Sequence, residues 1–599
     1  MGATTAAAAS SRAVGAATIA EAFRITAEDH PDRVAVRTKD DEISLTWSEL
    51  RDRVDGLARG LHELGVRRGD TVALMLGNRP EFHIADLAVM TLGATPFSIY
   101  ATSSPEQITY VVGDAQAKVA IVEELFLNQF RTAREQLPDL EHVVLLEGAQ
   151  GDDTLGWADV EATESDLDIE AAWRAVKPDD LITLIYTSGT TGPPKGVQLV
   201  HRNLMAATKG VEQLIRFPDG SKVISWLPSA HIAERMAHHY LPIVYAMTIT
   251  TCPNPRDIVG FLPTVKPTWF FAVPRIWEKL KAGMEGFLAT GEGGEQKMAM
   301  LDAAKRKVEL EQAGEPVPDD LAATVAQADE ALFSQIRAML GFDQIAAVNV
   351  GAAPTPREVL VFFHAIGVPV AELWGMSETC GAGACNPPEK IKLGTVGPPT
   401  PGVEAKLAED GELLIRSDVV MTGYRNLPDK TSEALDADGW LHTGDIATID
   451  EDGYISIVDR KKELIISAAG KNMSPANIES TLKGASPLIG QACTIGDGRS
   501  YNTALIVLDA DFAPAWAGQN GLEGKSLEEL AQEDSIRAAV QAGVDKANDQ
   551  LSRVEQIKKF TILEGDWAPG GDELTPTMKL KRKPIGEKYA SEIEAMYAR

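Results

Sequence analysis

The chain has 599 residues and a formal net charge of −30 at pH 7. Domains usually run to about 100–200 residues, so we expect more than one folded unit. Hydrophobic residues make up 44% and charged residues 24% of the chain, which is typical of a globular protein and argues against disorder throughout. The acidic balance excludes the basic footprint of a nucleic-acid-binding protein, although local groups can still hold the phosphates of a nucleotide.

The four cysteines form no C-x-x-C pair, which predicts neither a disulfide framework nor a thiolate zinc site and favours a reducing compartment. No run reaches the roughly 18–20 apolar residues of a membrane span. The N-terminus lacks the charged and apolar regions of a signal peptide. We therefore expect a cytoplasmic protein, and we leave open peripheral contact with a membrane and assembly into an oligomer.

Residues 1–15 are small and rich in alanine, and we expect them to form a flexible tail. From residue 16 to about 270, helical patterns alternate with short apolar runs, which predicts α/β layers with parallel sheets. The pattern of 45–64 predicts a helix that Thr46 caps, with Glu49 three positions further on. Buried strands are predicted at three apolar runs, 71–76, 119–122 and 142–146.

Apolar residues recur at helical spacing in 278–340, which predicts a helical insertion packed on a sheet; a helix that binds a partner or a membrane is the alternative. Between 400 and 455, Asp-Gly turns separate short strands, as is typical of antiparallel pairing. The charged run that begins at Asp459 marks an expected domain boundary. The two domains are then 16–458 and 459–599.

The strongest local signal is the segment YTSGTTGPPKGV at 186–197, which follows an apolar strand. Its glycines let the backbone approach a phosphate, its hydroxyl groups can donate to phosphate oxygens, and its lysine adds a positive charge. The spacing differs from that of a Walker A loop. The predicted phosphate-binding residues are Thr187, Ser188, Gly189, Thr190, Thr191, Gly192 and Lys195.

This segment closely resembles the phosphate loop of the adenylate-forming superfamily, which includes acyl-CoA synthetases, luciferases and the adenylation domains of peptide synthetases. Five further segments follow in the order of that family, so the resemblance covers about residues 20 to 583. It implies a large N-terminal AMP-binding domain of α/β subdomains with a small β-barrel-like part. It also implies a hinge to a smaller, mobile α+β C-terminal domain.

Two of these segments imply an adenine site. Gly351–Pro354 follows an apolar strand and resembles the family loop that lines the adenine pocket. The segment WGMSET, which starts at Trp374, resembles the family's aromatic-Gly-x-Thr-Glu motif, with Trp in place of the commoner Tyr and Ser377 in place of Thr. The resemblance implies that Trp374 stacks on adenine, that Ser377 reaches the α-phosphate and that Glu378 binds Mg²⁺. The implied adenine residues are Gly351, Ala352, Ala353, Trp374 and Gly375.

The segment GWLHTGD, which ends at Asp445, resembles the family's G-W-x-x-T-G-D motif and implies that this carboxylate accepts hydrogen bonds from the ribose hydroxyls. The next segment, Asp459–Arg460–Lys461, resembles the family's hinge. The resemblance makes Asp459 the pivot, and Arg460 a second group that reaches the ribose.

The segment LTPTMKLK near the C-terminus resembles the family's catalytic-lysine segment, and the P-T-x pattern selects Lys579 over its neighbours Lys581 and Lys583. The resemblance further implies that the C-terminal domain rotates between two reaction steps. The rotation withdraws Lys579 and brings the loop near Gly470 and Lys471 to the coenzyme A side of the site.

Two more segments, PSAHIAER at 228–235 and VPRIWEK at 273–279, resemble the long-chain and bubblegum-type fatty acyl-CoA synthetases. The resemblance implies that His231 lies near the substrate carboxylate and the mouth of an acyl tunnel. A histidine that only packs at a helix start is the alternative. Some relatives gate the tunnel with an aromatic residue a few positions on, where this chain has Glu234 and Arg235.

The sequence therefore predicts an enzyme that uses ATP and Mg²⁺ to activate a long-chain fatty acid as acyl-AMP and then forms the thioester with coenzyme A. A free carboxylate is a poor electrophile, and adenylation supplies a leaving group; Lys579, the loop donors and Mg²⁺ on Glu378 would stabilise the transition state. Two alternatives remain: an acyl-AMP ligase that loads a carrier protein, and a non-catalytic relative that binds a nucleotide or lipid.

Overall fold

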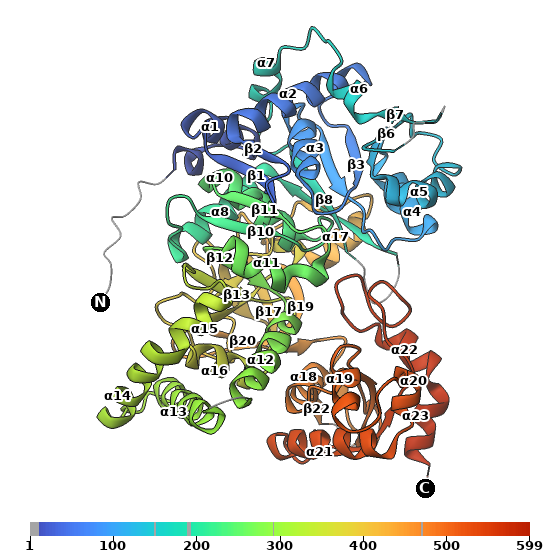
Figure 1. Cartoon of the computed structure of the whole chain (residues 1–599). Coiled ribbons are helices and arrows are strands. Elements are labelled where there is room, and N and C mark those ends of the chain that lie inside the picture. Colours follow the sequence, from blue (N-terminus) through green and yellow to red (C-terminus); the bar gives the residue numbers. More distant parts are fainter. Residues whose placement is uncertain are drawn as a thin grey trace.

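The structure is a computed structural model that describes residues 11–148, 151, 153–187, 193–290, 293–468 and 471–598. Figure 1 shows a large N-terminal body of stacked sheets and helices and a smaller C-terminal body, drawn in orange-red, beside helix α12 (Pro274–Ala289). The predicted α/β fold with a large N-terminal and a smaller C-terminal domain is confirmed.

A five-stranded parallel sheet, in the order β4-β3-β5-β6-β7, lies in the first part of the N-terminal domain. Residues of β3, β4 and β5 are buried on both faces, as expected for apolar runs covered by helices on each side. The three predicted strands are confirmed. The five strands are β3 (Thr71–Met75), β4 (Thr95–Ser98), β5 (Val119–Val122), β6 (His142–Leu145) and β7 (Leu155–Gly156).

Two further mixed sheets complete the α/β part of this domain, in the orders β10-β11-β1-β2 and β12-β13-β14-β15. The pairs β12·β13 and β13·β14 are parallel, so the carboxyl ends of β13 and β14 lie at the same edge of the sheet. The strands are β1 (Val34–Thr38), β2 (Ser44–Thr46), β10 (Lys222–Ser225), β11 (Thr248–Thr251), β12 (Trp269–Ala272), β13 (Ala347–Val350), β14 (Val370–Trp374) and β15 (Ala384–Cys385).

Helices cover these sheets. The predicted capping box is present: the Thr46 hydroxyl accepts from Glu49 N and the Glu49 carboxylate accepts from Thr46 N, at the start of α2. Helix α3 is buried along its whole length, because it lies between layers and has no solvent face. The helices up to β12 are α1 (Ile19–Asp29), α2 (Trp47–Glu63), α3 (Pro80–Thr91), α4 (Pro105–Ala115), α5 (Leu127–Arg134), α6 (Trp157–Glu161), α7 (Ile169–Arg174), α8 (His201–Leu214), α9 (Ile232–Arg235), α10 (Leu241–Tyr245) and α11 (Ile258–Val265).

The segment 278–340 is helical, as predicted, and its apolar residues pack on the main core. A π-helical turn, η5, interrupts it before its last helix. Helix α16 (Arg357–Ala365) then follows β13 and packs against α13 and α12. The segment consists of α12, α13 (Gly294–Gln312), α14 (Asp319–Ala328), η5 (Asp329–Phe333) and α15 (Ser334–Met339).

The region 400–460 forms an antiparallel sheet in the order β16-β17-β19-β20, which confirms the predicted pairing. Gly411 and Gly453 have φ near +84° and +83° and provide the left-handed residue of two of the Asp-Gly turns. A second antiparallel sheet, β18-β9-β8, flanks the phosphate-loop segment. The strands are β8 (Leu181–Thr187), β9 (Lys195–Val200), β16 (Glu404–Leu407), β17 (Glu412–Arg416), β18 (Gly423–Tyr424), β19 (Leu441–Ile449) and β20 (Ile455–Arg460).

The C-terminal body has apolar cores of its own, which run from Ile465 to Met596 and share no residue with the N-terminal cores. The expected boundary at Asp459 falls just before them. Its elements are β21 (Ile465–Ile466), β22 (Asn472–Met473), α18 (Pro475–Ala485), β23 (Ile489–Ile495), β24 (Asn502–Leu508), α19 (Phe512–Gln519), α20 (Leu527–Ala531), α21 (Asp534–Gln550), β25 (Ile557–Ile562), α22 (Arg582–Lys588) and α23 (Ala590–Tyr597).

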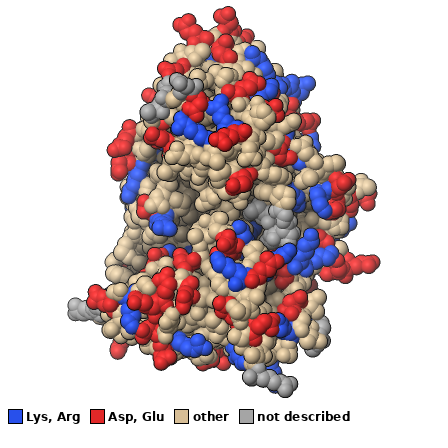
Figure 2. Space-filling model, turned by 90° about the vertical axis from the view of Figure 1, so that its right-hand side faces the viewer, with Lys and Arg blue, Asp and Glu red and all other residues tan. Residues whose placement is uncertain are grey.

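The tail prediction is wrong for residues 12–15. These residues form a 3₁₀ helix, η1 (Arg12–Gly15), because Ala13 and Val14 are small enough to bury against α1 and α10. Residues 1–10 lie outside the described ranges. No helix within those ranges is both long and apolar enough to cross a membrane. Figure 2 shows acidic and basic side chains interspersed over one face of the molecule rather than gathered into one basic patch.

Candidate active site

The phosphate-loop segment lies between two paired strands. Strands β8 and β9 are antiparallel, and Thr187 pairs with Lys195 across the turn, where the Thr187 hydroxyl donates to Lys195 O at 3.4 Å. The predicted residues Ser188 to Gly192 lie outside the described part of the chain. The structure therefore places the two ends of the loop, Thr187 and Lys195, side by side.

Lys195 and Glu378 meet at Tyr424, a residue that no sequence motif had indicated. The Lys195 ammonium lies 3.9 Å from the centre of the Tyr424 ring, and the Tyr424 hydroxyl donates to Oε1 of Glu378 at 2.7 Å. Burial lowers the pKa of Lys195, and the charge of Glu378 opposes that shift. Tyr424 reaches this position because β18 pairs with β9, a contact between segments far apart in the chain.

Glu378 lies in the short helix η6 (Ser377–Thr379), whose side chains are buried. The turn is tight: a side chain at Gly375 would meet the backbone of Gly381 at 2.3 Å, so only glycine fits. Oε1 of Glu378 is held by Tyr424, whereas no hydrogen bond to Oε2 is found within the described residues. Mg²⁺ prefers one or two carboxylates together with phosphate oxygens and water, so one oriented carboxylate beside the phosphate loop fits this ion.

The predicted adenine residues come together at one edge of a parallel sheet. Gly351 to Ala353 follow β13, and Trp374 ends the neighbouring β14. A side chain at Gly351 would meet Leu373 at 2.9 Å, and Ala352 adopts a left-handed φ of 72°. The loop therefore packs closely against the end of β14. The carboxyl edge of such a sheet is where ligands bind in open α/β folds.

Two side chains hold Asp445, one by a hydrogen bond and one by an ion pair. The Trp374 indole N–H donates to its Oδ2 at 2.8 Å, and the Arg460 guanidinium lies 2.7 Å from its Oδ1. Arg460 is the cross-strand partner of Asp445, since β19 pairs with β20 in that register. Burial raises the pKa of Asp445, and the charge of Arg460 opposes the shift. Adenine stacking by Trp374 remains a prediction.

Lys579 reaches this group from the C-terminal domain. Its backbone is fixed by Thr575, whose N–H donates to Lys579 O at 2.8 Å and whose hydroxyl accepts from Lys579 N at 3.0 Å. Desolvation by the surrounding protein and the charge of Arg460 lower the pKa of Lys579, while Asp445, Glu463 and Glu378 oppose the shift. The side chain nevertheless remains accessible to solvent. The charges of the N-terminal domain thus act on Lys579 across the domain boundary.

The neighbouring lysines are directed elsewhere. The Lys581 ammonium donates to Gly571 O at 2.7 Å, within the C-terminal domain. Lys583 is exposed and lies 3.9 Å from Glu587 on the same helix. The contacts of Lys581 and Lys583 thus stay within the C-terminal domain, and the catalytic role of Lys579 remains a prediction.

His231 caps α9 and is half-buried. Its Nδ1 accepts from Ala233 N at 3.1 Å, which assigns the ring proton to Nε2. Burial, together with the charge of Lys579, lowers the pKa of His231 to about 4. The ring is therefore neutral at pH 7 and has an Nε2–H to donate.

The predicted pivot, Asp459, links the two domains through hydrogen bonds. Its Oδ2 accepts from the Ser474 hydroxyl at 2.6 Å and from Ala476 N at 3.1 Å, at the start of α18. Of the predicted loop on the coenzyme A side, Gly470 lies outside the described residues, and Lys471 is exposed beside β22.

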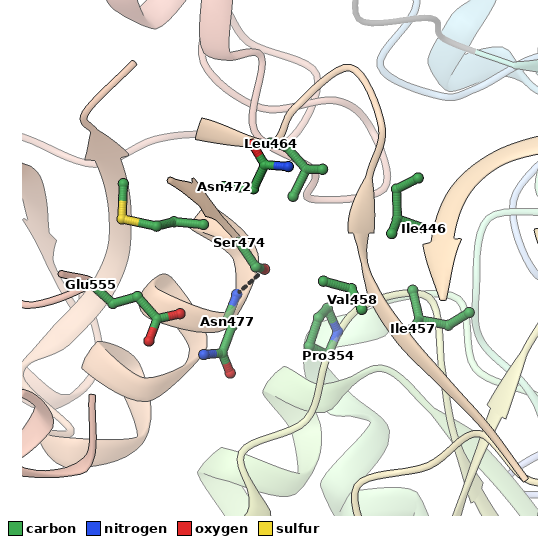
Figure 3. Close-up of a pocket in the computed structure, with 10 residues that line it drawn as sticks. Pro354, Ile446, Ile457, Val458, Leu464, Asn472, Ser474, Asn477 and Glu555 are labelled. Atoms are coloured by element: carbon green, nitrogen blue, oxygen red, sulfur yellow. Dashed lines mark hydrogen bonds between the residues drawn. The ribbon is translucent and has the colours of Figure 1, made fainter. Parts of the chain in front are cut away.

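A cavity of about 380 Å³ lies next to this pivot, between the domains. Figure 3 shows residues of β19, β20 and the Gly351–Pro354 loop on one side of the cavity and residues of the C-terminal domain on the other. It is lined by Pro354, Ile446, Ile457, Val458, Leu464, Asn472, Met473, Ser474, Asn477 and Glu555.

Comparison with known proteins agrees with this arrangement. A family model described as AMP-binding enzyme matches residues 23–425, and one described as AMP-binding enzyme C-terminal domain matches residues 462–599. Together these matches show that the chain belongs to the AMP-binding enzyme family. The geometry and the family thus define an adenylate-forming enzyme.

Two relatives are from Mycobacterium tuberculosis. The putative fatty-acid–CoA ligase fadD11 is 51% identical over 452 residues, which are 74% of this chain and 79% of that protein. The long-chain-fatty-acid–CoA ligase FadD15 is 35% identical over 581 residues, which are 95% of each chain. Among solved structures, the adenylation domain of a carboxylate reductase from Mycobacterium chelonae has the same fold, with a TM-score of 0.75 at 19% identity over 98% of this chain and 93% of that one.

Proposed function

We propose that the protein converts a long-chain fatty acid to its acyl-adenylate with ATP and then to acyl-CoA, with release of pyrophosphate and AMP. The observation that carries the proposal is that Lys579, from the C-terminal domain, lies within electrostatic reach of Glu378, Asp445 and His231 of the N-terminal domain. The relatives named as fatty-acid–CoA ligases support the choice of acid and acceptor, since one of them aligns with 95% of the chain.

In the first step a carboxylate oxygen of the fatty acid attacks the α-phosphorus of ATP. An O–P bond forms, and the bond to pyrophosphate breaks, with its electron pair leaving on pyrophosphate. Negative charge accumulates around phosphorus, where the Lys579 and Lys195 ammonium groups stabilise it. Lys579 acts as a charge rather than as a base. The neutral His231 donates its Nε2–H to the acid and thereby orients it.

The nucleoside is held by groups that are already fixed before it binds. Oδ2 of Asp445 accepts a hydrogen bond from Trp374 and Oδ1 forms an ion pair with Arg460, so each oxygen keeps a lone pair for a ribose hydroxyl. The loop Gly351–Ala353 lines adenine beside Trp374, and Ser377 donates to the α-phosphate. Glu378 would hold Mg²⁺, which when bound neutralises charge on the phosphates.

In the second step the thiol of coenzyme A attacks the acyl carbon and loses its proton to solvent, a C–S bond forms, and AMP leaves with the electrons of the broken C–O bond. Lys579 is not needed here, and a rotation about Asp459 withdraws it and brings the Gly470–Lys471 loop to the site. The hydrogen bonds of Asp459 and the cavity beside it are features that such a rotation would rearrange.

One assay series tests the proposal. ATP–pyrophosphate exchange is measured with fatty acids of several chain lengths, followed by acyl-CoA formation, for wild type, Lys579→Ala and the control Lys583→Ala. We expect exchange to fall by about 10²-fold or more in Lys579→Ala only, because one charge at a transition state is worth about 3 kcal/mol or more. No exchange with any fatty acid would refute the proposal. Exchange without acyl-CoA would favour loading of a carrier protein.

A further inference from the structure

A group of charged side chains is buried in the N-terminal core between α3 and the helix made of α9, η3 (Met236–Tyr240) and α10. Asp86, Glu234 and Arg235 have no exposed surface. The turn η3 has π-helical geometry, which occurs frequently at functional sites. A buried ion pair is often no more stable than a well-packed apolar cluster of the same size. Stability alone therefore does not account for this group.

Arg235 joins the loop before α9 to the parallel sheet and its helix. Its guanidinium donates to Oδ2 of Asp86 on α3 at 2.6 Å, to the Ser98 hydroxyl on β4 at 3.0 Å and to Ser229 O in the loop at 3.2 Å. Burial alone would raise the pKa of Asp86, but the neighbouring positive charge, chiefly that of Arg235, brings it below its ordinary value. The carboxylate is therefore ionised and the pair is charge-assisted.

Glu234 holds the same loop from the other side. Its Oε2 accepts from Leu227 N at 2.9 Å and from Trp226 N at 3.4 Å, while its Oε1 accepts from the Ser225 hydroxyl at 2.6 Å. Asn78 donates to Leu227 O at 2.8 Å. Side chains from the core thus satisfy and fix the backbone of this loop, which leads directly into His231.

Neither Glu234 nor Arg235 is free to move as the gate of an acyl tunnel would have to be. A side chain that opens and closes an acyl tunnel needs space and replaceable contacts, whereas Glu234 and Arg235 are fully buried and bonded at several atoms. Some of these contacts end on the backbone of the loop before His231, at Leu227 N, Trp226 N and Ser229 O. Through that loop they are linked to His231, the residue to which the proposed function gives the acid.

We propose that Glu234 and Arg235 are positioning residues for the acid: they hold the loop before α9 so that the Nε2–H of His231 meets the fatty-acid carboxylate beside Lys579. The assignment rests on the proposed function, because that function gives His231 its role. It predicts that disturbing these residues affects the acid and leaves ATP unaffected.

The test uses Glu234→Gln, which keeps the size of the side chain but removes its charge. We expect KM for the fatty acid in ATP–pyrophosphate exchange to rise about tenfold, the effect of one charge-assisted hydrogen bond, with KM for ATP within about twofold of wild type. Because Glu234 acts through His231, the double variant with His231→Gln should be no worse than His231→Gln alone. Additive losses, or an equal rise in KM for ATP, would overturn the proposal.

Glu161→Gln is the matched control, because Glu161 accepts charge-assisted hydrogen bonds from Arg53 and a bond from Trp157 in the α2–α6 region. Its KM values for the fatty acid and for ATP should both stay at the wild-type level.

If Glu234→Gln does not fold, as judged by circular dichroism, Ser225→Ala removes a single donor to Glu234 and should give a smaller rise in KM for the fatty acid alone. Wild type without fatty-acid-dependent exchange would refute the proposed function and this assignment together; additive variants in an active enzyme would refute the assignment alone.

Discussion

The indole N–H of Trp374 donates to Oδ2 of Asp445 at 2.8 Å, and both side chains are buried. The aromatic residue of the adenine loop is therefore also a hydrogen-bond donor to the carboxylate assigned to the ribose. A tyrosine, the commoner residue in the motif that this segment resembles, has no ring N–H to supply this bond. Under the proposed function, the contact connects recognition of the base with recognition of the sugar.

Trp374→Phe should weaken ATP binding while leaving the acid unaffected. The ring remains available for stacking, but Asp445 loses one of its two anchors. A hydrogen bond to a charged group is worth about 1.5–3 kcal/mol, so we expect KM for ATP to rise about tenfold or more, with kcat changed less. Steady-state kinetics with ATP and 2′-deoxy-ATP measure the effect, and the preference for the ribose should shrink.

Trp173→Phe is the control for this variant, because Trp173 donates to the carboxylate of Glu170 at 2.9 Å on helix α7. It removes the same kind of bond away from the site and should leave KM for ATP unchanged. A Trp374→Phe enzyme with normal KM for ATP and undiminished ribose preference would show that the contact has no role in binding.

Much of the site could be predicted because its chemistry is concentrated in short segments. Lys195, Glu378, Asp445 and Lys579 each lie in a motif whose residue types indicate phosphate, metal or ribose, and the structure brings them together. Their roles remain predictions. The capping box at Thr46 was equally local and is present.

The remaining contacts depend on pairing between segments that are far apart in the chain. Tyr424 meets Glu378 only because β18 pairs with β9, and Trp374 meets Asp445 only because Trp374 packs into the core of the β16-β17-β19-β20 sheet. The buried role of Arg235 was equally hidden, because a Glu-Arg pair at a helix start ordinarily faces solvent. The one sequence feature that could have indicated burial was the apolar residues on either side of that pair.

Tyr424→Phe should raise the Mg²⁺ requirement. The hydroxyl holds Oε1 of Glu378 at 2.7 Å, and its loss frees the carboxylate to rotate, while the ring still contacts Lys195. An ordinary hydrogen bond contributes about 0.5–1.5 kcal/mol, which corresponds to a rise of about threefold to tenfold in the Mg²⁺ concentration for half-maximal exchange. Tyr245→Phe, which removes a hydroxyl bonded to Thr208 O, should not change it. Equal Mg²⁺ curves for both variants would contradict the assignment of Glu378.

Near neutral pH, His231 should not contribute to the pH dependence of kcat/KM for the fatty acid. Burial and the charge of Lys579 lower the pKa of His231 from 6.5 to about 4, so the neutral ring is favoured in the folded protein. Protonation of this residue therefore opposes folding as the pH falls below 6.5 towards 4. Profiles of kcat/KM for the fatty acid between about pH 5.5 and pH 9 should have the same shape in wild type and His231→Gln, at a lower level in the variant. A wild-type inflection near pH 6.5 that vanishes in His231→Gln would contradict this.

Two ion pairs join α12 to the C-terminal domain in the arrangement where Lys579 meets the site: Arg275 with Asp509, and Lys279 with Asp511. Figure 1 shows α12 beside the C-terminal body. Asp509 is buried and Asp511 is exposed, so the first pair should contribute more. Arg275→Asp reverses one charge and should lower ATP–pyrophosphate exchange several-fold, because it destabilises the arrangement that adenylation needs.

A variant with the charges of Arg275 and Asp509 exchanged distinguishes an effect on domain orientation from an effect on folding. Arg275→Asp combined with Asp509→Arg restores opposite charges and should recover most of the exchange rate, whereas each single variant stays low. Thioester formation from supplied acyl-AMP should fall less than exchange in the single variants, since that step does not need Lys579 at the site. Lys279→Glu, at the exposed pair, should have little effect. If the single variants lower both steps equally and the swap does not recover exchange, these pairs do not hold the adenylation arrangement.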